Sequence, residues 1–376
     1  MTQRSRALQA PYLRIPSPRG GDGLAISESS KEALGRVDAV VFDCDGVLID
    51  ARRSYDGTIR VVVETMVDEL AGVRLRLAGI MPRLIATVRR TGGFNSDWDT
   101  SYALTLFSVV ALGQREGGSR AKARGVPEAL TEVVTRFGSA PRGRGQEAVD
   151  SFLESAFPSL KGSLDRAREH MGYPRTPPEG RMTTVFDELY FGSSLFEKVH
   201  GVRASSPRIR GLIELERTLV KRRTLQSLEK ALGGGRLAMI TGRPFVGTER
   251  SLGKGIMRYF DKEASMFIGD ADIDLDLRAE YDGYRKPSPE ALIRARERLS
   301  SETLLYVGDS AEDLMMVQGA RRSGLDGILF AGVYQTSAVR ADQASFFERE
   351  GSDVVAESVN QIPSGLLLPP KGKRGR

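Results

Sequence analysis

The feature that most constrains the fold is one short apolar strand that stands alone ahead of a long helical segment. The run 37–42 (Val-Asp-Ala-Val-Val-Phe) is β-branched and aromatic and leads directly into acidic turn residues, as a buried strand does. From about residue 51 to 229 the apolar residues recur almost only with helical spacing. The helices predicted in this segment cover 59–70, 101–112, 127–137, 148–157 and 184–199.

After residue 230, strands and helices alternate. Strands are predicted to end at Thr241, Gly269 and Gly308, and two more lie at 327–330 and 353–355. The helices predicted between and after them cover 288–299, 311–323 and 338–348. This alternation indicates an α/β protein with a Rossmann-like parallel sheet covered by helices. Because one strand precedes the helical segment and the rest follow it, that segment is predicted to be an inserted α-helical cap domain.

These patterns set the expected domain limits. Residues 1–35 are rich in Pro, Ser, Gly and Arg and are interpreted as a disordered basic arm. The sheet domain is expected to be discontinuous, over 36–50 and 230–370, with the cap over 51–229. Residues 371–376 form a short basic tail.

The net charge of +6 and the pI of about 9.4 invite an interpretation as a nucleic-acid-binding protein. The arm and the tail hold most of the excess, however, so a nucleic-acid partner is not expected. The single cysteine, Cys44, excludes a disulfide framework and a Cys-rich zinc site. No run approaches the ~18 consecutive apolar residues of a membrane span. No secretory signal is visible either, so we expect a cytoplasmic protein without membrane attachment.

Polar side chains follow three predicted strands, where open α/β sheets bind their ligands. Asp43, Thr241 and Asp309 follow strands, and Lys286 stands just before the helix 288–299. An aspartate can attack phosphorus and form an acyl phosphate when cations surround the transferring group. Asp43 and Asp309 would hold a divalent cation, and Mg²⁺ is the usual ion for carboxylate, phosphate and water oxygens. Lys286 would supply the second positive charge.

The remaining groups complete a phosphoryl-transfer site. The Thr241 hydroxyl and the Gly242 backbone N–H would bind phosphate oxygens. Asp45 stands two residues beyond Asp43 and is expected to point to the same side. It can protonate the leaving oxygen and later deprotonate water, as general acid and then general base. The candidate catalytic residues are therefore Asp43, Asp45, Thr241 and Lys286.

Together these residues resemble the four motifs of the haloacid dehalogenase superfamily. The motifs stand in order as Asp43-Cys-Asp-Gly-Val, Thr241, Lys286 and Gly-Asp309-Ser-Ala-Glu-Asp313. The resemblance implies that the metal ligands are the Asp43 side chain, the Asp45 main-chain carbonyl and the Asp309 side chain, with Asp313 close by. The dehalogenase branch lacks the second aspartate, so the resemblance implies phosphoryl transfer. The insert between the first two motifs is similar to that of the subfamily with an α-helical cap.

Two strings in the cap are similar to strings of an uncharacterised archaeal and cyanobacterial clade that resembles phosphoglycolate phosphatases. They are 92–99 (Gly-Gly-Phe-Asn-Ser-Asp-Trp-Asp) and 186–192 (Phe-Asp-Glu-Leu-Tyr-Phe-Gly). Asn95, Asp97 and Trp98 could line a specificity loop. The alternative is a helix-capping turn with Trp98 in the core, since Asn and Asp commonly begin helices.

Arg243 also has two interpretations. It could touch an anionic substrate, or it could lie at the surface with only its stem buried.

The expected function is hydrolysis of a small phosphorylated metabolite by a Mg²⁺-dependent phosphatase. Two alternatives stay open. A phosphomutase would keep the same motifs and return the phosphoryl group to a sugar. A non-catalytic, nucleic-acid-associated protein would instead use its basic ends. The sequence leaves the substrate and the oligomeric state open, a homodimer included.

Overall fold

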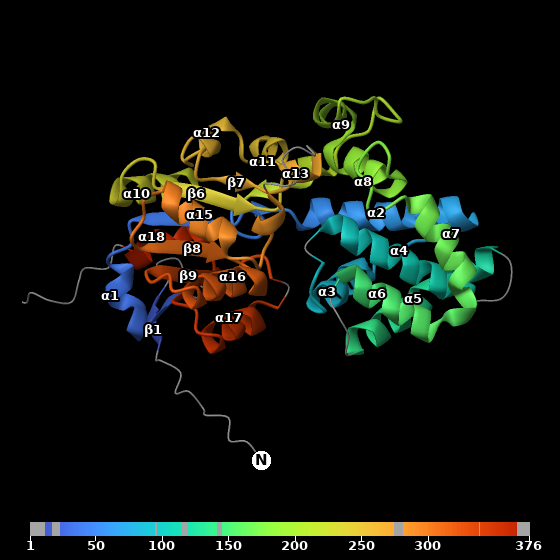
Figure 1. The fold of residues 1–376 in the computed structure, drawn as a ribbon, viewed down its shortest axis with the longest axis horizontal. Coiled ribbons are helices and arrows are strands. Elements are labelled where there is room, and N and C mark those ends of the chain that lie inside the picture. Colours follow the sequence, from blue (N-terminus) through green and yellow to red (C-terminus); the bar gives the residue numbers. More distant parts are fainter. Residues whose placement is uncertain are drawn as a thin grey trace, which may run out of the picture. The chain divides into compact units, whose positions relative to one another are not determined.

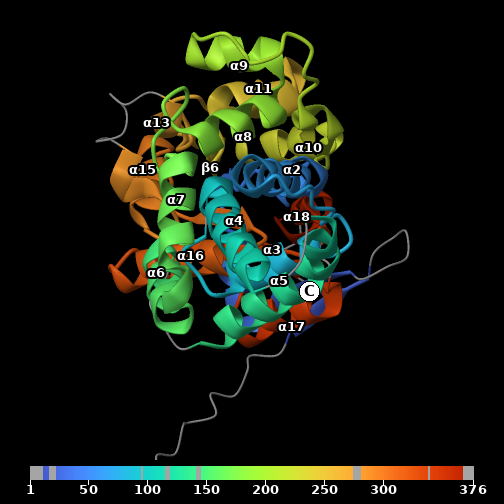
Figure 2. The same cartoon turned by 90° about the vertical axis from the view of Figure 1, so that its right-hand side faces the viewer.

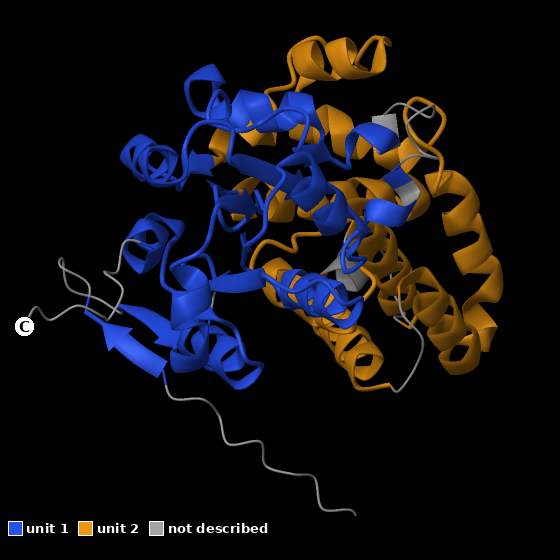
Figure 3. Ribbon diagram, turned by 60° about the vertical axis from the view of Figure 1, so that its left-hand side comes forward, with its two compact units in different colours: residues 1–50, 217–376 blue, residues 51–216 orange. Residues whose placement is uncertain are grey.

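The computed structural model describes residues 12–16, 23–94, 96–114, 119–140, 145–273, 281–337 and 339–366. The chain divides into two compact units, which Figure 3 colours blue and orange. Unit 1 comprises residues 1–50 and 217–376, and unit 2 comprises residues 51–216. No helix among the described residues is long and apolar enough to span a membrane.

Unit 1 is built around an eight-stranded sheet in the order β1-β2-β10-β9-β8-β3-β6-β7. The strands are β1 (Tyr12–Ile15), β2 (Leu24–Ser27), β3 (Ala39–Phe42), β6 (Leu237–Thr241), β7 (Met266–Phe267), β8 (Leu304–Gly308), β9 (Ile328–Val333) and β10 (Val354–Ala356). The six strands from β10 to β7 are parallel, and β1 and β2 are antiparallel. The predicted α/β fold with a Rossmann-like sheet is confirmed, with an antiparallel edge added.

Three helices of unit 1 pack on one face of this sheet. Figure 1 shows them over the strands: α15 (Glu290–Arg298), α16 (Ala311–Arg322) and α17 (Arg340–Arg349). The strand residues of the core on this side include Ala39, Val41, Ala238, Ile240, Leu304, Tyr306, Ile328 and Phe330. Their partners on α15 and α16 include Ala291, Leu292, Leu314 and Val317. Because successive side chains of a strand point to opposite faces, these strand residues line the one face on which the three helices pack.

The described part of unit 1 contains further helices. They are α1 (Lys31–Leu34), α10 (Arg222–Leu232), α11 (Phe245–Leu252), α12 (Lys254–Met257), α13 (Asp270–Ile273) and α18 (Ile362–Leu366). On the opposite face of β3, Phe42 packs edge-on against Phe260, with 5.9 Å between ring centroids. The central strand is therefore buried on both faces, as expected for a parallel sheet.

The interpretation of residues 1–35 as a disordered arm is wrong for 12–15 and 24–34. Leu24, Ala25 and Ile26 are buried, and β2 pairs with β10 through Val354↔Ile26 and Val355↔Ala25. A strand this short, next to Gly and Ser residues, leaves little trace in the local composition. Its burial comes from a partner more than 300 residues later in the chain. Residues 1–11 and the tail 371–376 lie outside the described part of the chain.

Unit 2 is helical. Its helices are α2 (Arg52–Ala71), α3 (Met81–Arg90), α4 (Asp97–Gly113), α5 (Ser119–Ser139), α6 (Gly145–Ala156), α7 (Lys161–Met171), α8 (Arg181–Phe191) and α9 (Ser193–His200). Figure 2 shows α4 in the middle of this bundle, where it packs against α2, α3, α5, α6, α7 and α8. Nearly every residue from Thr100 to Leu112 is buried, because α4 is apolar around its whole circumference.

One predicted helix and the predicted end of the cap are among the boundaries that differ from the structure. The helix predicted over 184–199 breaks at Gly192, which separates α8 from α9 with φ of 76°. A Cβ there would lie 2.4 Å from the Gly211 nitrogen, so only glycine fits. The cap was expected to reach residue 229, whereas unit 2 ends at Glu216. The helix α10 belongs to unit 1, where Thr224 donates a hydrogen bond to Asn360 at 2.7 Å.

Two short strands of unit 1 flank the inserted residues 51–216 in the sequence. They are β4 (Ile49–Asp50) and β5 (Arg217–Thr218), which pair antiparallel. The chain therefore leaves and re-enters unit 1 through one small ribbon.

Candidate active site

The candidate site lies where β8, β3 and β6 end side by side. The central strand β3 is hydrogen-bonded to β8 on one side and to β6 on the other, with Phe42 level with Val307 and Met239. Parallel strands bring their carboxyl ends to one edge of the sheet. Asp43, Thr241 and Asp309, which the sequence separates by almost 270 residues, therefore share this edge.

Asp43 is held by both its main chain and its side chain. Its N–H continues the strand ladder to the Val307 carbonyl at 2.9 Å. Its Oδ1 accepts a hydrogen bond from the Cys44 N–H at 2.7 Å and lies 2.7 Å from Lys286 Nζ. These contacts fix a short carboxylate directly at the end of a buried strand, which suits a nucleophile.

Lys286 bridges two carboxylates. It stands between the 3₁₀ turn Asp282–Tyr284 and α15, and its Nζ also lies 2.8 Å from Asp313 Oδ1. Burial alone would lower the pKa of the Lys286 ammonium. The adjacent Asp313 and Asp43 carboxylates outweigh that effect and hold its pKa well above the ordinary value. A permanently charged ammonium thus sits beside the candidate nucleophile.

Asp313 is fully buried, and hydrogen bonds occupy both of its oxygens. Oδ1 accepts from the Tyr306 hydroxyl at 3.0 Å and pairs with Lys286. Oδ2 accepts from the Asp309 N–H and from both the N–H and hydroxyl of Ser310. Burial by itself raises the pKa of Asp313, but Lys286 and Ser310 lower it below the usual range. Asp313 is arranged to position Lys286 and the Asp309 turn.

Asp309 approaches the turn that follows β3. A Cβ on Gly46 would lie only 1.8 Å from Asp309 Oδ2, so glycine makes this approach sterically accessible. Gly46 also adopts φ of 76°, which disfavours other residues. The glycine in the first motif therefore brings the Asp309 carboxylate close to the turn that carries Asp45.

Two residues that contact Asp309 were not predicted from the sequence. The Thr336 hydroxyl lies 3.4 Å from Asp309 Oδ2, and Gln343 Nε2 donates to the Asp309 carbonyl at 3.1 Å. Neither has a local sequence signal. The role of Ser310 was visible in principle, because Ser310 and Asp313 form a capping box at the start of α16.

The carboxylates of Asp43, Asp309 and Asp313 each offer an oxygen within 4.8 Å of one another. Burial raises the pKa of Asp43 to about 7, with Lys286 opposing and Asp313 and Asp45 adding to the rise. Burial and the neighbouring Asp43 also raise the pKa of Asp309 well above its ordinary value. One lysine therefore does not compensate this cluster. A divalent cation bound by oxygen ligands fits the donor set.

Thr241 and Gly242 lie at the end of β6. Thr241 is 1% exposed, and its hydroxyl oxygen accepts a hydrogen bond from the Arg243 N–H at 3.1 Å. A Cβ on Gly242 would meet no atom within 4 Å, so there is open space beside this backbone. The position is compatible with the expected binding of phosphate oxygens at this turn.

Arg243 does not lie at the surface, so that interpretation is wrong. Its side chain is 1% exposed, and its Nη1 lies 2.7 Å from Asp45 Oδ1. The Asp45 side chain itself is 37% exposed. The guanidinium meets a protein carboxylate, where the sequence suggested contact with a substrate anion.

The cap candidates have partners within unit 2. Ser96 caps α4 by accepting from the Trp98 N–H, and Asp97 pairs with Arg89. Trp98 Nε1 donates to Asp187 Oδ1 at 3.2 Å. A helix-capping turn is therefore present, but Ser96 forms it and Trp98 is only partly buried. Asn95 lies outside the described residues.

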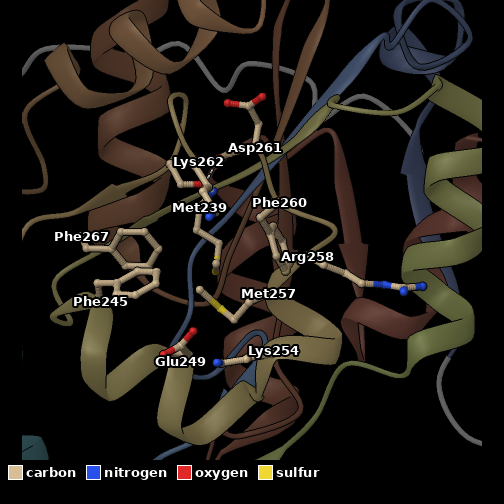
Figure 4. A pocket seen from close by; sticks show the side chains of 11 residues that line it. Met239, Phe245, Glu249, Lys254, Met257, Arg258, Phe260, Asp261, Lys262 and Phe267 are labelled. Atoms are coloured by element: carbon tan, nitrogen blue, oxygen red, sulfur yellow. Dashed lines mark hydrogen bonds between the residues drawn. The ribbon is translucent and has the colours of Figure 1, made fainter.

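Unit 1 also contains an apolar cavity of about 330 Å³ near α11 and α12. Figure 4 shows Met239 and Met257 pointing toward one another, and Phe245 meeting Phe267 edge-on. None of the acidic motif residues lines this cavity. The candidate chemistry therefore belongs to the strand ends, where the motif residues lie.

A family model described as haloacid dehalogenase-like hydrolase matches residues 37–321. Among solved structures, the chain is similar to Northeast Structural Genomics Consortium target ZR25, with a TM-score of 0.57 and 20% identity over 88% of this chain and 98% of that chain. It also matches phosphatase Tt82 from Thermococcus thioreducens, with a TM-score of 0.49 and 24% identity over 83% and 99% of the two chains. No curated protein sequence matches. At these identities the structural likeness concerns the fold alone.

Proposed function

Because the chain belongs to the haloacid dehalogenase-like hydrolases, we propose that it is a phosphatase that cleaves a small phosphomonoester through an aspartyl phosphate on Asp43. One observation carries the proposal. Lys286 Nζ lies 2.7 Å from the Asp43 carboxylate and 2.8 Å from that of Asp313. Thr241 and Asp309 lie at the same edge of the sheet. A nucleophile, a fixed cation and phosphate-binding groups thus come from neighbouring strand ends.

In the first half of the reaction, a carboxylate oxygen of Asp43 attacks phosphorus and the bond from phosphorus to the leaving oxygen breaks. Asp45 donates a proton to that oxygen, so the product leaves as a neutral alcohol. Lys286 and the Thr241 hydroxyl bind the phosphoryl oxygens during the transfer. In the second half, Asp45 takes a proton from water, which attacks phosphorus and regenerates the Asp43 carboxylate with release of phosphate.

The acidic cluster would also hold Mg²⁺. We assign Asp43, the Asp45 carbonyl and Asp309 as its ligands, with Asp313 supporting them through Lys286 and Ser310. The ion would neutralise charge on the nucleophile and the phosphoryl oxygens. Such compensation is needed because the described acidic groups lie within 4.8 Å of one another.

The test is acid-quench trapping of the phosphoenzyme. The purified protein would be mixed with Mg²⁺ and a panel of ³²P-labelled phosphorylated metabolites, then quenched, digested and sequenced by mass spectrometry. We expect label on the peptide that contains Asp43, together with release of inorganic phosphate. Asp326→Asn is the matched control, because Asp326 is exposed at the opposite end of the sheet, ahead of β9. Label with formation of sugar bisphosphate instead of phosphate would identify a phosphomutase, and turnover without label on Asp43 would refute the mechanism.

A further inference from the structure

Arg243 is among the largest fully buried side chains of the protein. It stands two residues beyond Thr241, on the turn that leads from β6 into α11. Nη1 donates to Asp45 Oδ1 at 2.7 Å, and Nη2 donates to Ser251 Oγ at 3.3 Å. The guanidinium thus joins the turn after β3 to the last turn of α11.

Burying a guanidinium costs free energy unless a carboxylate and further acceptors compensate it. Its partner here is not a structural carboxylate deep in the core. Asp45 is 37% exposed and stands on the turn that also carries Gly46. A buried cation that reaches out to one partly exposed carboxylate restricts the torsions of that side chain. The same charge placed elsewhere in the core would not do so.

The geometry also selects between the two oxygens of Asp45. Arginine only donates hydrogen bonds and does not give up its proton in proteins. Because Oδ1 accepts from Nη1, the contact favours the other oxygen, Oδ2, as the one that carries the acid proton of Asp45. The charge-assisted contact holds the carboxyl plane with one defined edge toward the protein.

We propose that Arg243 is a positioning residue, which holds the Asp45 carboxyl group so that Oδ2 meets the oxygen of the leaving group. The inference rests on the proposed function, in which Arg243 does not bind the phosphoryl group, and it gives Arg243 a role in that reaction. Ser251 supports the same arrangement from α11. Its hydroxyl also donates to the Gly247 carbonyl, and its own carbonyl accepts from the Thr218 hydroxyl on β5.

A positioning role predicts a dependence on the leaving group. Proton donation matters for a poor leaving group such as an alkoxide and matters little for 2,4-dinitrophenolate. The measurement is kcat/KM with Mg²⁺ for an alkyl phosphate and for 2,4-dinitrophenyl phosphate. For Arg243→Met we expect the ratio of the two kcat/KM values to fall on the order of 10²-fold. Arg243→Lys keeps a donor but loses the planar guanidinium, so its ratio should lie between those of the wild type and Arg243→Met.

A double-mutant cycle with Asp45→Asn separates positioning from a structural role. In the Asp45→Asn background, Arg243→Met should produce little further change in the ratio, because the group it positions is gone. Equal losses on both substrates, or losses that add fully to those of Asp45→Asn, would overturn the inference. If Arg243→Met does not fold, Arg243→Lys decides the question by the same ratio, and an unchanged ratio refutes positioning.

The proposed function fails separately. A wild-type protein that turns over neither phosphate ester with Mg²⁺ would contradict the phosphatase assignment. A wild type that cleaves both esters, with Arg243 variants of unaltered selectivity, would contradict only the positioning role.

Discussion

The acidic residues of the sheet edge differ in their surroundings from those of the helical unit 2, which we propose to be the cap. At the sheet edge, the carboxylates of Asp43, Asp309 and Asp313 lie close together, and burial and the neighbouring carboxylates raise the pKa of Asp43 and of Asp309. In the cap, Asp187 meets both His200 and Trp98, and its side chain is only 7% exposed. In the first region several carboxylates lie together, whereas in the second a single carboxylate is hydrogen-bonded to two side chains.

The difference separates residues that hold the fold together from residues that the fold holds in place. A cluster of like charges costs stability and is retained where binding or chemistry uses it. A satisfied network restrains the helices that supply it. Substitutions of the carboxylates at the sheet edge should therefore change activity more than stability, and substitutions in the network around Asp187 should do the reverse.

The largest expected effect is at Asp43. Asp43→Asn removes the nucleophile and should lower kcat on the order of 10⁶-fold, as losses of covalent nucleophiles do. The free energy of unfolding without Mg²⁺ should change little, because the substitution also removes a carboxylate that burial disfavours. Steady-state kinetics and urea unfolding measure the two quantities. A variant with near-normal turnover, or one that is mainly unfolded, would remove the contrast between the two regions.

Lys286→Met should affect both properties. The loss of a cation beside the transferring group is expected to lower kcat/KM on the order of 10³-fold. It also leaves Asp43 and Asp313 without their shared partner, and breaking a buried ion pair of this kind costs about 3–5 kcal/mol. Arg298→Met, on the exposed end of α15, is the control for loss of a cation. Equal stability of the Lys286 variant and wild type would show that the cluster is already compensated by other means.

The dependence of stability on pH follows from the raised pKa of Asp43. Its folded-state pKa of about 7 lies above the unfolded value of 3.8, so the folded protein binds this proton more tightly. The contribution of Asp43 is therefore fully present below pH of about 4 and is lost as the pH rises through about 7. Thermal unfolding with EDTA should show Tm falling across this window.

Mg²⁺ should reverse that trend, because the cation binds the ionised carboxylates and competes with protons. The increase in Tm on adding Mg²⁺ should be larger at pH 8 than at pH 5.5 by a few degrees, roughly. Asp309→Asn should abolish most of the increase and serves as the control for non-specific salt effects. An equal increase at both pH values would contradict a carboxylate metal site.

The sheet and its motif residues could be predicted from the sequence for a local reason. Strands β3, β6 and β8 are buried apolar runs that lead into a polar residue, so the local sequence predicts both the end of each strand and its functional side chain. Because these strands are parallel neighbours in one sheet, Asp43, Thr241 and Asp309 lie at the same edge. Asp313 was identified by the resemblance to the family motifs, and its capping box with Ser310 spans only four residues.

The rest depends on contacts between distant segments. The strand β2 becomes buried only by pairing with β10, and Thr336 reaches Asp309 only because β9 lies beside β8. Arg243 was ambiguous because a charged side chain after a strand gives no sign of the carboxylate it will meet. That carboxylate is 198 residues away in the sequence.

The smallest effect is expected in the cap, at Asp187→Asn. The carboxylate accepts from Trp98 Nε1 at 3.2 Å and from His200 Nε2 at 2.9 Å, and an amide keeps only one acceptor for these two donors. The free energy of unfolding should fall by about 1–2 kcal/mol, since a buried donor loses its partner. Asp165→Asn is the matched control, because its pair with Arg168 is 53% exposed on the Asp165 side and should contribute under about 0.5 kcal/mol. Urea unfolding and kcat/KM with 2,4-dinitrophenyl phosphate measure the result. If Asp187→Asn lowered kcat/KM by more than about tenfold while stability held, the network around Trp98 would serve substrate binding, and the division between a functional sheet edge and a structural cap network would have to be redrawn.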